Sequence, residues 1–250
     1  MTDSESALTR LRRYLLDPDT FFAALVQKPP QYRGPLLIVL AAGILSAISS
    51  WLVMSWMCSF FLAGLAGTGT EYRFISALFG LILVVASAAS LFGPLMIAAV
   101  AGFVFYFLAG FVKKGGNLVL SITAAAWGMV PLAVYELIQI PLFLAFRPGM
   151  GITVSPEFFA MMNNTAAASA LDKQAILSMI AFNQPFYTYT MLNAGLHALA
   201  WLACAWFWIP AVRNTCAVEQ RQASLIVLVP LLVYLAVTFG PALLTGGHPV

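Results

Sequence analysis

Two side chains capable of acid–base chemistry, Glu136 and His197, lie deep within apolar stretches of the sequence. Each is about ten residues, or roughly 15 Å of helix, from one end of its stretch, which is near the middle of a bilayer. An ionisable side chain is costly at that depth and often belongs to a path for protons or ions. A carboxyl group that faces an imidazole can pass a proton to it, so this pair is the first candidate site.

Two amide side chains extend the pair. Gln139 follows Glu136 by three residues and Asn193 precedes His197 by four, so each amide shares a helix face with its ionisable neighbour. If the two helices are antiparallel neighbours, Glu136 faces His197. Gln139 then faces Asn193, which predicts an intramembrane polar cluster. The alternative interpretation is that these side chains are contacts between helices, each worth about 0.6 kcal/mol.

The sequence offers few residues for other kinds of chemistry. It has no GxSxG, HExxH or phosphate-loop motif, and its two histidines are His197 and His248. The three cysteines, Cys58, Cys204 and Cys216, form no CxxC pair, which argues against a disulfide framework and a cysteine zinc site. We therefore expect no enzyme activity, no catalytic residue, no cofactor and no metal.

The composition is that of a polytopic membrane protein, whose first partner is the lipid bilayer. Of 250 residues, 62% are hydrophobic and 8% are charged, whereas about a quarter of the residues in soluble domains are charged. The net charge of +3 is too small to indicate binding of nucleic acid. Residues 1–34 are polar and lack a short apolar core with a cleavage site, so we expect no removable signal peptide.

Two long apolar runs, 35–66 and 75–112, leave the number of membrane crossings open. As straight helices they would measure roughly 48 and 57 Å, against a hydrocarbon core of about 30 Å. Either the second run folds back at Gly93-Pro94, which gives six spans, or it is one helix, which gives five. The polar turn Lys113-Lys114-Gly115-Gly116-Asn117 lies on opposite sides of the membrane in the two cases.

The distribution of Lys and Arg favours five spans. With five spans and a cytosolic N-terminus, nine of these residues lie inside and three outside. The inner nine are Arg10, Arg12, Arg13, Lys28, Arg33, Lys113, Lys114, Arg213 and Arg221. With six spans the distribution is seven against five, which fits the positive-inside rule less well.

The elements that must position the polar residues follow from this choice. The predicted fold is all-α, a bundle of five transmembrane helices behind a cytosolic N-terminal region, residues 1–34. The membrane domain is 35–250, with spans at about 35–66, 75–112, 118–146, 187–211 and 223–244. The third span contains Pro131 and Pro141. The outer loop, 147–186, is expected to hold two short helices, one starting at Ser155 and one running from Ser169 through Phe182.

The N-terminal region contains two predicted amphipathic helices. Leu8, Leu11 and Leu15 recur at helical spacing. Arg10, Arg12 and Arg13 lie beside them and form a predicted anchor on an anionic membrane surface. In the second helix Asp17 is the predicted N-cap and Pro18 the first residue. Its apolar face consists of Phe21, Phe22, Leu25 and Val26. A docking site for a soluble partner is the alternative to the anchor.

Short motifs in a fixed order resemble the Yip family, the Ypt-interacting proteins and their prokaryotic relatives. The motifs are Leu15-Leu16-Asp17-Pro18-x-x-Phe21-Phe22, Gly34-Pro35-Leu36-Leu37, Gly115-Gly116 and Gly128-x-x-Pro131-Leu132. The resemblance covers essentially the whole chain. It implies a cytosolic N-terminal region followed by five spans. Eukaryotic members act in vesicle trafficking, associate with Rab-type GTPases and with one another, and shape membranes, with no catalysis ascribed to them.

These observations favour a non-catalytic scaffold or adaptor that associates with itself or with other membrane proteins. For a prokaryotic relative we expect the plasma membrane, with the N-terminus in the cytosol and the C-terminus outside. The alternative is a small transport or channel component that uses the intramembrane polar cluster. A transporter needs a wet cavity at the level of Glu136, and a scaffold does not.

Overall fold

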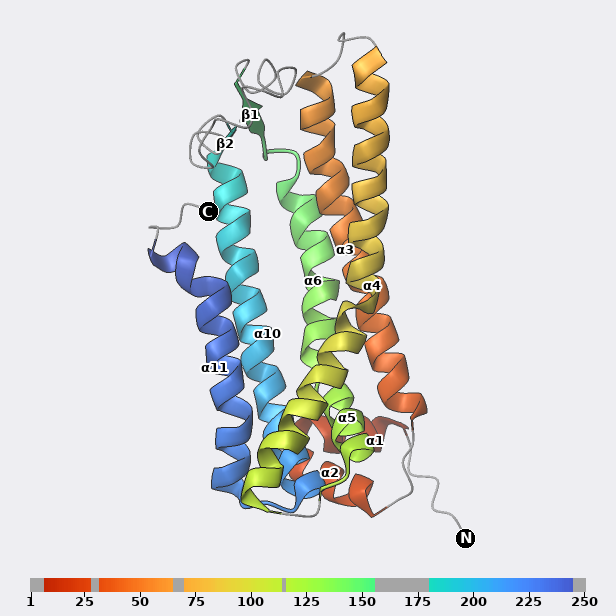
Figure 1. Ribbon diagram of the computed structural model, residues 1–250, viewed down its shortest axis with the longest axis vertical. Helices are drawn as coiled ribbons and strands as arrows, with labels where there is room; N and C mark the ends of the chain where they lie inside the picture. Colours follow the sequence, from red (N-terminus) through yellow and green to blue (C-terminus); the bar gives the residue numbers. More distant parts are fainter. Residues whose placement is uncertain (1–6, 28–31, 65–69, 114–115, 156–179, 245–250) are drawn as a thin grey trace. The chain divides into compact units, whose positions relative to one another are not determined.

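The computed structural model describes residues 7–27, 32–64, 70–113, 116–155 and 180–244, and nearly all of these residues are helical (Figure 1). The elements in chain order are α1 (Ala7–Leu16), α2 (Pro18–Val26), α3 (Arg33–Gly64), α4 (Thr70–Val112), α5 (Leu118–Trp127), α6 (Val130–Phe146), β1 (Ile152–Val154), β2 (Ile180–Phe182), α10 (Gln184–Cys216) and α11 (Gln220–Leu244). The predicted class, an all-α membrane bundle, is confirmed.

Five stretches of the described chain are long and apolar enough to cross a membrane. They are Arg33–Ala63, Arg73–Val112, Leu118–Phe146, Gln184–Cys216 and Gln220–Thr238. The second stretch belongs to α4, a single helix of 43 residues that continues through Gly93 and Pro94. Because α4 does not fold back there, the five-span prediction is confirmed and the six-span alternative is excluded.

The chain divides into two compact units. Unit 1 comprises Met1–Ile44, Leu91–Tyr135 and His197–Gly240, and unit 2 comprises Leu45–Ser90, Glu136–Leu196 and Pro241–Val250. The long helices α3, α4 and α10 each contribute one part to each unit. Each unit has its own aromatic core, around Tyr14 and Phe22 in unit 1 and around Trp56 and Phe143 in unit 2.

The third span consists of two helices, whereas the sequence predicted one helix with Pro131 inside it. Pro131 has no N–H group, so it cannot donate to the carbonyl of Trp127 four residues earlier. The chain tightens instead, and the N–H of Met129 donates to the carbonyl of Ala126 at 3.2 Å. The helix is therefore interrupted at Gly128 and Met129, while Pro141 remains inside α6.

The second N-terminal helix, α2, begins as its sequence predicts. The side chain of Asp17 accepts a hydrogen bond from the N–H of Thr20 at 3.2 Å, and Pro18 is the first residue of α2. Phe21 and Phe22 are buried, whereas Val26 is more than a third exposed. Among the α1 side chains that the structure describes, Tyr14 is buried and Leu15 is exposed. The side chains of Leu8 and Leu11 lie outside the described residues, so the predicted leucine stripe stays a prediction.

The loop after α6 contains strands at the places where the structure describes it. Ile152–Val154 pairs antiparallel with Ile180–Phe182, so the prediction of a helix through Phe182 is wrong there. The rest of the two predicted loop helices, residues 156–179, lies outside the described residues. Asn183 closes the strand pair, because its side chain accepts from the N–H of Gly151 at 2.9 Å and donates to the carbonyl of Gly149 at 2.8 Å.

Candidate functional site

The interruption between α5 and α6 leaves two carbonyl groups that side chains from distant parts of unit 1 complete. The carbonyl of Trp127, which Pro131 cannot serve, accepts a hydrogen bond from the Tyr14 hydroxyl at 2.8 Å. The carbonyl of Ala125 accepts one from the indole N–H of Trp208, also at 2.8 Å. A buried polar group without a partner costs about 1–3 kcal/mol. The two hydrogen bonds therefore tie α1 and α10 to the break.

Two glycines, Gly34 and Gly128, allow tryptophan side chains to approach the backbone near the break between α5 and α6. A Cβ atom added at Gly128 would overlap the indole ring of Trp208. A Cβ atom at Gly34 would lie 2.6 Å from Cζ2 of Trp127. Such close approach requires a residue without a side chain. Both glycines belong to the motifs that resemble the Yip family, and the structure gives these motifs a packing role.

Tyr14 belongs to a group of buried aromatic and alanine residues that we call the N-terminal cluster. The cluster consists of Tyr14, Phe21, Phe22, Ala124, Phe207 and Ala211. The Tyr14 ring stacks on Phe207, with centroids 4.6 Å apart and planes 6° apart, and meets Phe21 edge-on at 5.2 Å. Burial raises the pKa of the Tyr14 hydroxyl above its ordinary value. The hydroxyl therefore stays protonated and remains a donor at neutral pH.

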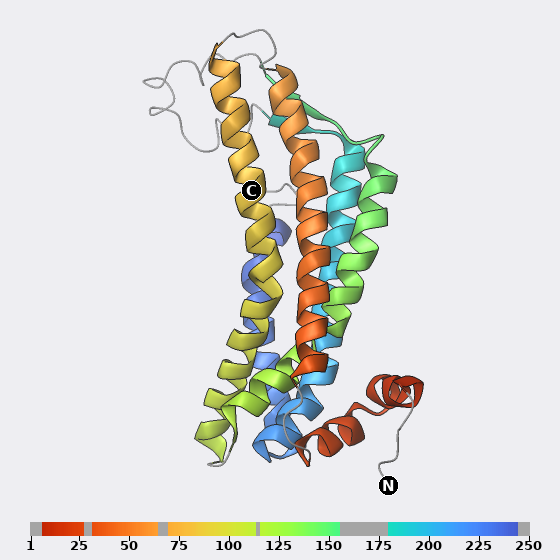
Figure 2. The ribbon, with the colours of Figure 1, turned by 90° about the vertical axis from the view of Figure 1, so that its right-hand side faces the viewer.

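A polar contact at the edge of the N-terminal cluster joins α2 to α10. Asp19 receives a hydrogen bond from Arg213 at 3.0 Å on one carboxylate oxygen and from Asn214 at 3.1 Å on the other. Figure 2 shows α2 beside the end of α10 that carries these residues. Since Asp19 and Arg213 are both nearly half exposed, their ion pair contributes little stability and mainly sets the orientation of α2.

The double-lysine turn also has a structural contact in unit 1. The ammonium group of Lys113 donates to the carbonyl of Ala217 at 2.8 Å. Ala217 directly follows the last residue of α10 and has a φ of 51°. The carbonyl groups at a helix end lack donors within the helix, and a lysine can supply one. Lys113 thus connects the end of α4 to the end of α10.

The predicted membrane anchor is partly described. Arg12 and Arg13 are exposed on α1, and the side chain of Arg10 lies outside the described residues. Leu15 and Leu16 are exposed as well, Leu16 to 73%. This helix therefore presents cationic and apolar side chains away from the N-terminal cluster. That arrangement is typical of a helix on a membrane surface, and the anchor stays a prediction.

His197, from the predicted polar cluster, lies in unit 1 next to aromatic residues. Its Nε2 accepts a hydrogen bond from the indole N–H of Trp201 at 2.9 Å. Its ring stacks on Tyr135, with centroids 4.8 Å apart and planes 12° apart. An acceptor Nε2 is unprotonated, so this hydrogen bond favours the neutral imidazole.

The other three predicted residues, Glu136, Gln139 and Asn193, lie in unit 2. The side chain of Ser46 on α3 is close enough to the carboxyl group of Glu136 to act on it. Gln139 approaches the Tyr189 hydroxyl, and Glu136 acts on the same hydroxyl electrostatically. Asn193 is half-buried on α10. The pairings of Glu136 with His197 and of Gln139 with Asn193 stay predictions.

Several residues of these sites were not found from the sequence. They are Tyr14, Asp19, Ser46 and Trp208, whose partners are on other helices, and Trp201, whose partner His197 is four residues earlier on α10. One signal was present, because a proline inside a span frees a carbonyl group that needs a donor. That signal gives the position of the acceptor but not the identity of the donor.

In the described part of the chain no group of three or more His, Cys, Asp or Glu side chains could hold a metal ion. Comparison with known proteins gives one family match and neither a curated protein nor a solved structure that matches. The family model of the Yip1 domain matches residues 12–240. This range contains all the motifs quoted above, from Leu15 to Leu132, and all five membrane-spanning stretches. The chain therefore belongs to the Yip1-domain family.

Proposed function

We propose that this protein is a non-catalytic scaffold or adaptor, which associates with itself or with other membrane proteins through a surface formed by α1 and α2. The observation that carries this proposal is the attachment of α1 and α2 to the break between α5 and α6 by the Tyr14 hydrogen bond. A region held in this way presents a fixed surface to a partner. Fixing that surface in advance lowers the ordering cost of binding.

The proposed orientation places α1 and α2 in the cytosol. Arg12 and Arg13 then face the anionic inner leaflet, where each basic residue contributes about 1 kcal/mol of attraction. Exposed Leu16 on the same helix adds apolar contact with the interface. We infer that Arg10, Arg12 and Arg13 hold α1 on the membrane while Tyr14 holds it on the protein.

Photocrosslinking in intact membranes tests the adaptor proposal. In one variant a photoreactive amino acid replaces Thr20, which is exposed on α2. In a separate variant it replaces Val233, which is exposed on a membrane span. We expect one recurrent protein product at position 20, either a second copy or one other membrane protein, and lipid products at position 233. The same product should be lost when Phe22→Ala weakens the N-terminal cluster. Lipid products alone at both positions would contradict the proposal.

Thiol labelling tests the membrane anchor. Leu16→Cys is placed in the full chain and reconstituted in anionic or in neutral vesicles. We expect slower labelling by a water-soluble maleimide in anionic vesicles, and a loss of this difference in Arg12→Gln/Arg13→Gln. Equal labelling in both kinds of vesicle would show that α1 does not lie on the surface.

Transport is the competing function, because Glu136 is an acidic side chain within a membrane span. We propose that Glu136, Gln139, Asn193 and His197 act as contacts between helices, since Ser46 of α3 acts on the carboxyl group of Glu136 and His197 stacks on Tyr135 of α6. Proteoliposome flux separates the two functions. Flux that depends on pH and disappears in Glu136→Gln would establish transport and overturn the scaffold, whereas equal background flux supports the scaffold.

A further inference from the structure

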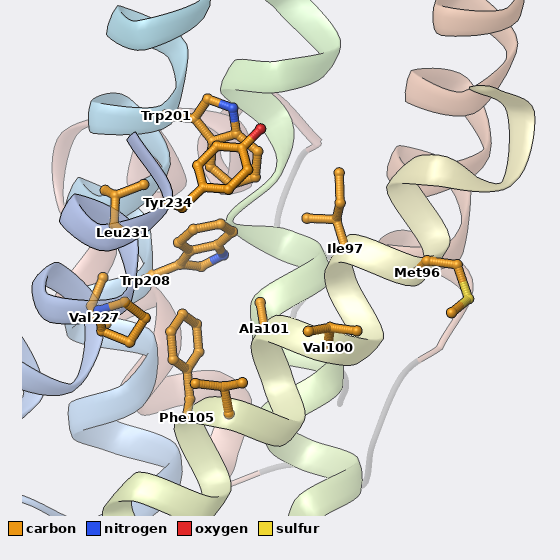
Figure 3. A pocket seen from close by; sticks show the side chains of 12 residues that line it. Met96, Ile97, Val100, Ala101, Phe105, Trp201, Trp208, Val227, Leu231 and Tyr234 are labelled. Atoms are coloured by element: carbon orange, nitrogen blue, oxygen red, sulfur yellow. The ribbon is translucent and has the colours of Figure 1, made fainter. Parts of the chain in front are cut away.

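Unit 1 contains an apolar pocket of about 370 Å³ between α4, α10 and α11 (Figure 3). Its lining includes Ala101 and Phe105 of α4, Trp201 and Trp208 of α10, and Leu231 and Tyr234 of α11. Figure 3 shows the two tryptophans and Phe105 between the walls that α4 and α11 provide. Pockets for small ligands range from about 300 to 1,000 Å³, so this volume is large enough for a ligand.

The chemistry of the lining selects an apolar occupant. The indole N–H of Trp208 donates to the carbonyl of Ala125. The indole N–H of Trp201 donates to Nε2 of His197. Both hydrogen-bond donors are thus engaged within the protein, and the rings present carbon atoms to the pocket. The remaining polar group among the lining side chains is the hydroxyl of Tyr234. A buried water needs two to four polar partners, and an ion would lose its hydration without replacement.

The pocket lies within the membrane-spanning stretches of all three helices. It is continuous with the face that lipid covers, because Met96 and Val100 line it and are 60% and 55% exposed. From Trp201 to Trp208 the pocket follows α10 for about 10 Å. A hydrocarbon chain of the bilayer runs roughly parallel to a spanning helix, so the shape and surroundings of the pocket fit such a chain.

We propose that this pocket binds one acyl chain of a bilayer phospholipid, which lies along α10 against Trp201 and Trp208. The aromatic rings provide the contact area, and the α11 wall with Leu231 and Tyr234 separates the chain from bulk lipid. The protein would therefore carry a bound lipid within unit 1, in addition to the lipid that surrounds every membrane protein.

Photolabelling in proteoliposomes tests this proposal directly. The full-length protein is reconstituted in phosphatidylcholine that carries a diazirine in the middle of one acyl chain, irradiated, digested and analysed by mass spectrometry. The informative comparison is between two buried residues of α11, Leu231, which lines the pocket, and Ile226, which does not. We expect labelling of Leu231 to exceed that of Ile226 several-fold. Equal labelling of the two would overturn the proposal.

Filling the pocket provides a second test. Ala101→Phe places a ring inside it, and Ala236→Phe places the same ring on an exposed position of α11 that does not line it. We expect labelling of Leu231 to fall several-fold in Ala101→Phe and to remain at the wild-type level in Ala236→Phe. If Ala101→Phe does not fold, the comparison of Leu231 with Ile226 in the wild-type protein still tests the proposal. Crosslinks from the pocket to a second copy, without lipid products, would show that a protein helix occupies it and would contradict the proposal.

Discussion

The hydroxyl of Tyr14 donates a 2.8 Å hydrogen bond to the carbonyl oxygen of Trp127, across 113 residues of sequence. This carbonyl is the one that Pro131 leaves without a helical donor. Pro131, from a family motif within a span, and Tyr14, from the N-terminal region, therefore act on the same carbonyl group. Their joint effect explains how the N-terminal helices are held in unit 1.

Tyr14→Phe should destabilise unit 1, because it removes the hydroxyl and leaves the Trp127 carbonyl without its donor. We expect a loss of about 1–2 kcal/mol, seen as a lower midpoint of thermal unfolding in detergent. Tyr32→Phe is the control, since Tyr32 is 56% exposed, and it should change little. Equal midpoints for Tyr14→Phe and wild type would show that the hydrogen bond contributes nothing.

Alkaline pH should weaken the same contact. Burial raises the pKa of Tyr14 in the folded protein, so the neutral hydroxyl is favoured by folding. This stability is fully present below about pH 10, the ordinary pKa of tyrosine, and is lost as the pH rises above that value. The midpoint temperature of thermal unfolding should therefore fall more steeply for wild type than for Tyr14→Phe as the pH rises from neutral to strongly alkaline. Parallel curves would argue against a buried Tyr14 hydroxyl.

Gly128→Ala should displace the Trp208 indole, since the new methyl group would occupy the space of that ring. Overpacking of this kind costs about 1–3 kcal/mol. Gly110→Ala is the matched control, because no atom outside the helix backbone lies within 4 Å of its added Cβ. In the control, alanine should stabilise α4 by about 0.5–1 kcal/mol. Thermal midpoints that move in the same direction for both variants would contradict the packing role of Gly128.

Ala217→Gly should stabilise the protein. Ala217 has a φ of 51° after the end of α10, where a residue with a Cβ atom pays roughly 1 kcal/mol that glycine avoids. Ala236→Gly, in the interior of α11, is the opposite case and should destabilise by about 1 kcal/mol. The midpoint of thermal unfolding should rise for Ala217→Gly and fall for Ala236→Gly. The prediction fails if both midpoints fall.

The number of membrane crossings could be predicted because it depends on local and additive properties. The length of each apolar run and the positions of Lys113 and Lys114 were enough to choose five spans. The cap at Asp17 was also readable, because its donor, the N–H of Thr20, is three residues away. Such features need no knowledge of which helices are neighbours.

The partners within the site could not be predicted for the opposite reason. The sequence gives no sign of Ser46 on α3, whose side chain acts on the carboxyl group of Glu136, and the pairing of Glu136 with His197 on α10 stays a prediction. The sequence gives the depth of Glu136 in the membrane, and several polar residues on other helices lie at a similar depth. Which of them contacts Glu136 depends on which helices pack together. The strand at Ile180–Phe182 was missed because the capping pattern at Ser169 suggested a helix, while strand pairing with Ile152–Val154 depends on a distant segment.

The attachment of the N-terminal region to the rest of unit 1 is the claim on which the proposed function depends. Thiol crosslinking between α2 and α10 in native membranes tests it most directly. Asp19→Cys and Asn214→Cys replace two side chains that contact each other, and the native cysteines Cys58, Cys204 and Cys216 are buried. A short bifunctional thiol reagent should join the pair within one chain, and the yield should fall when Phe22→Ala is added. Absence of this crosslink, with each single cysteine still labelled by maleimide, would contradict the account.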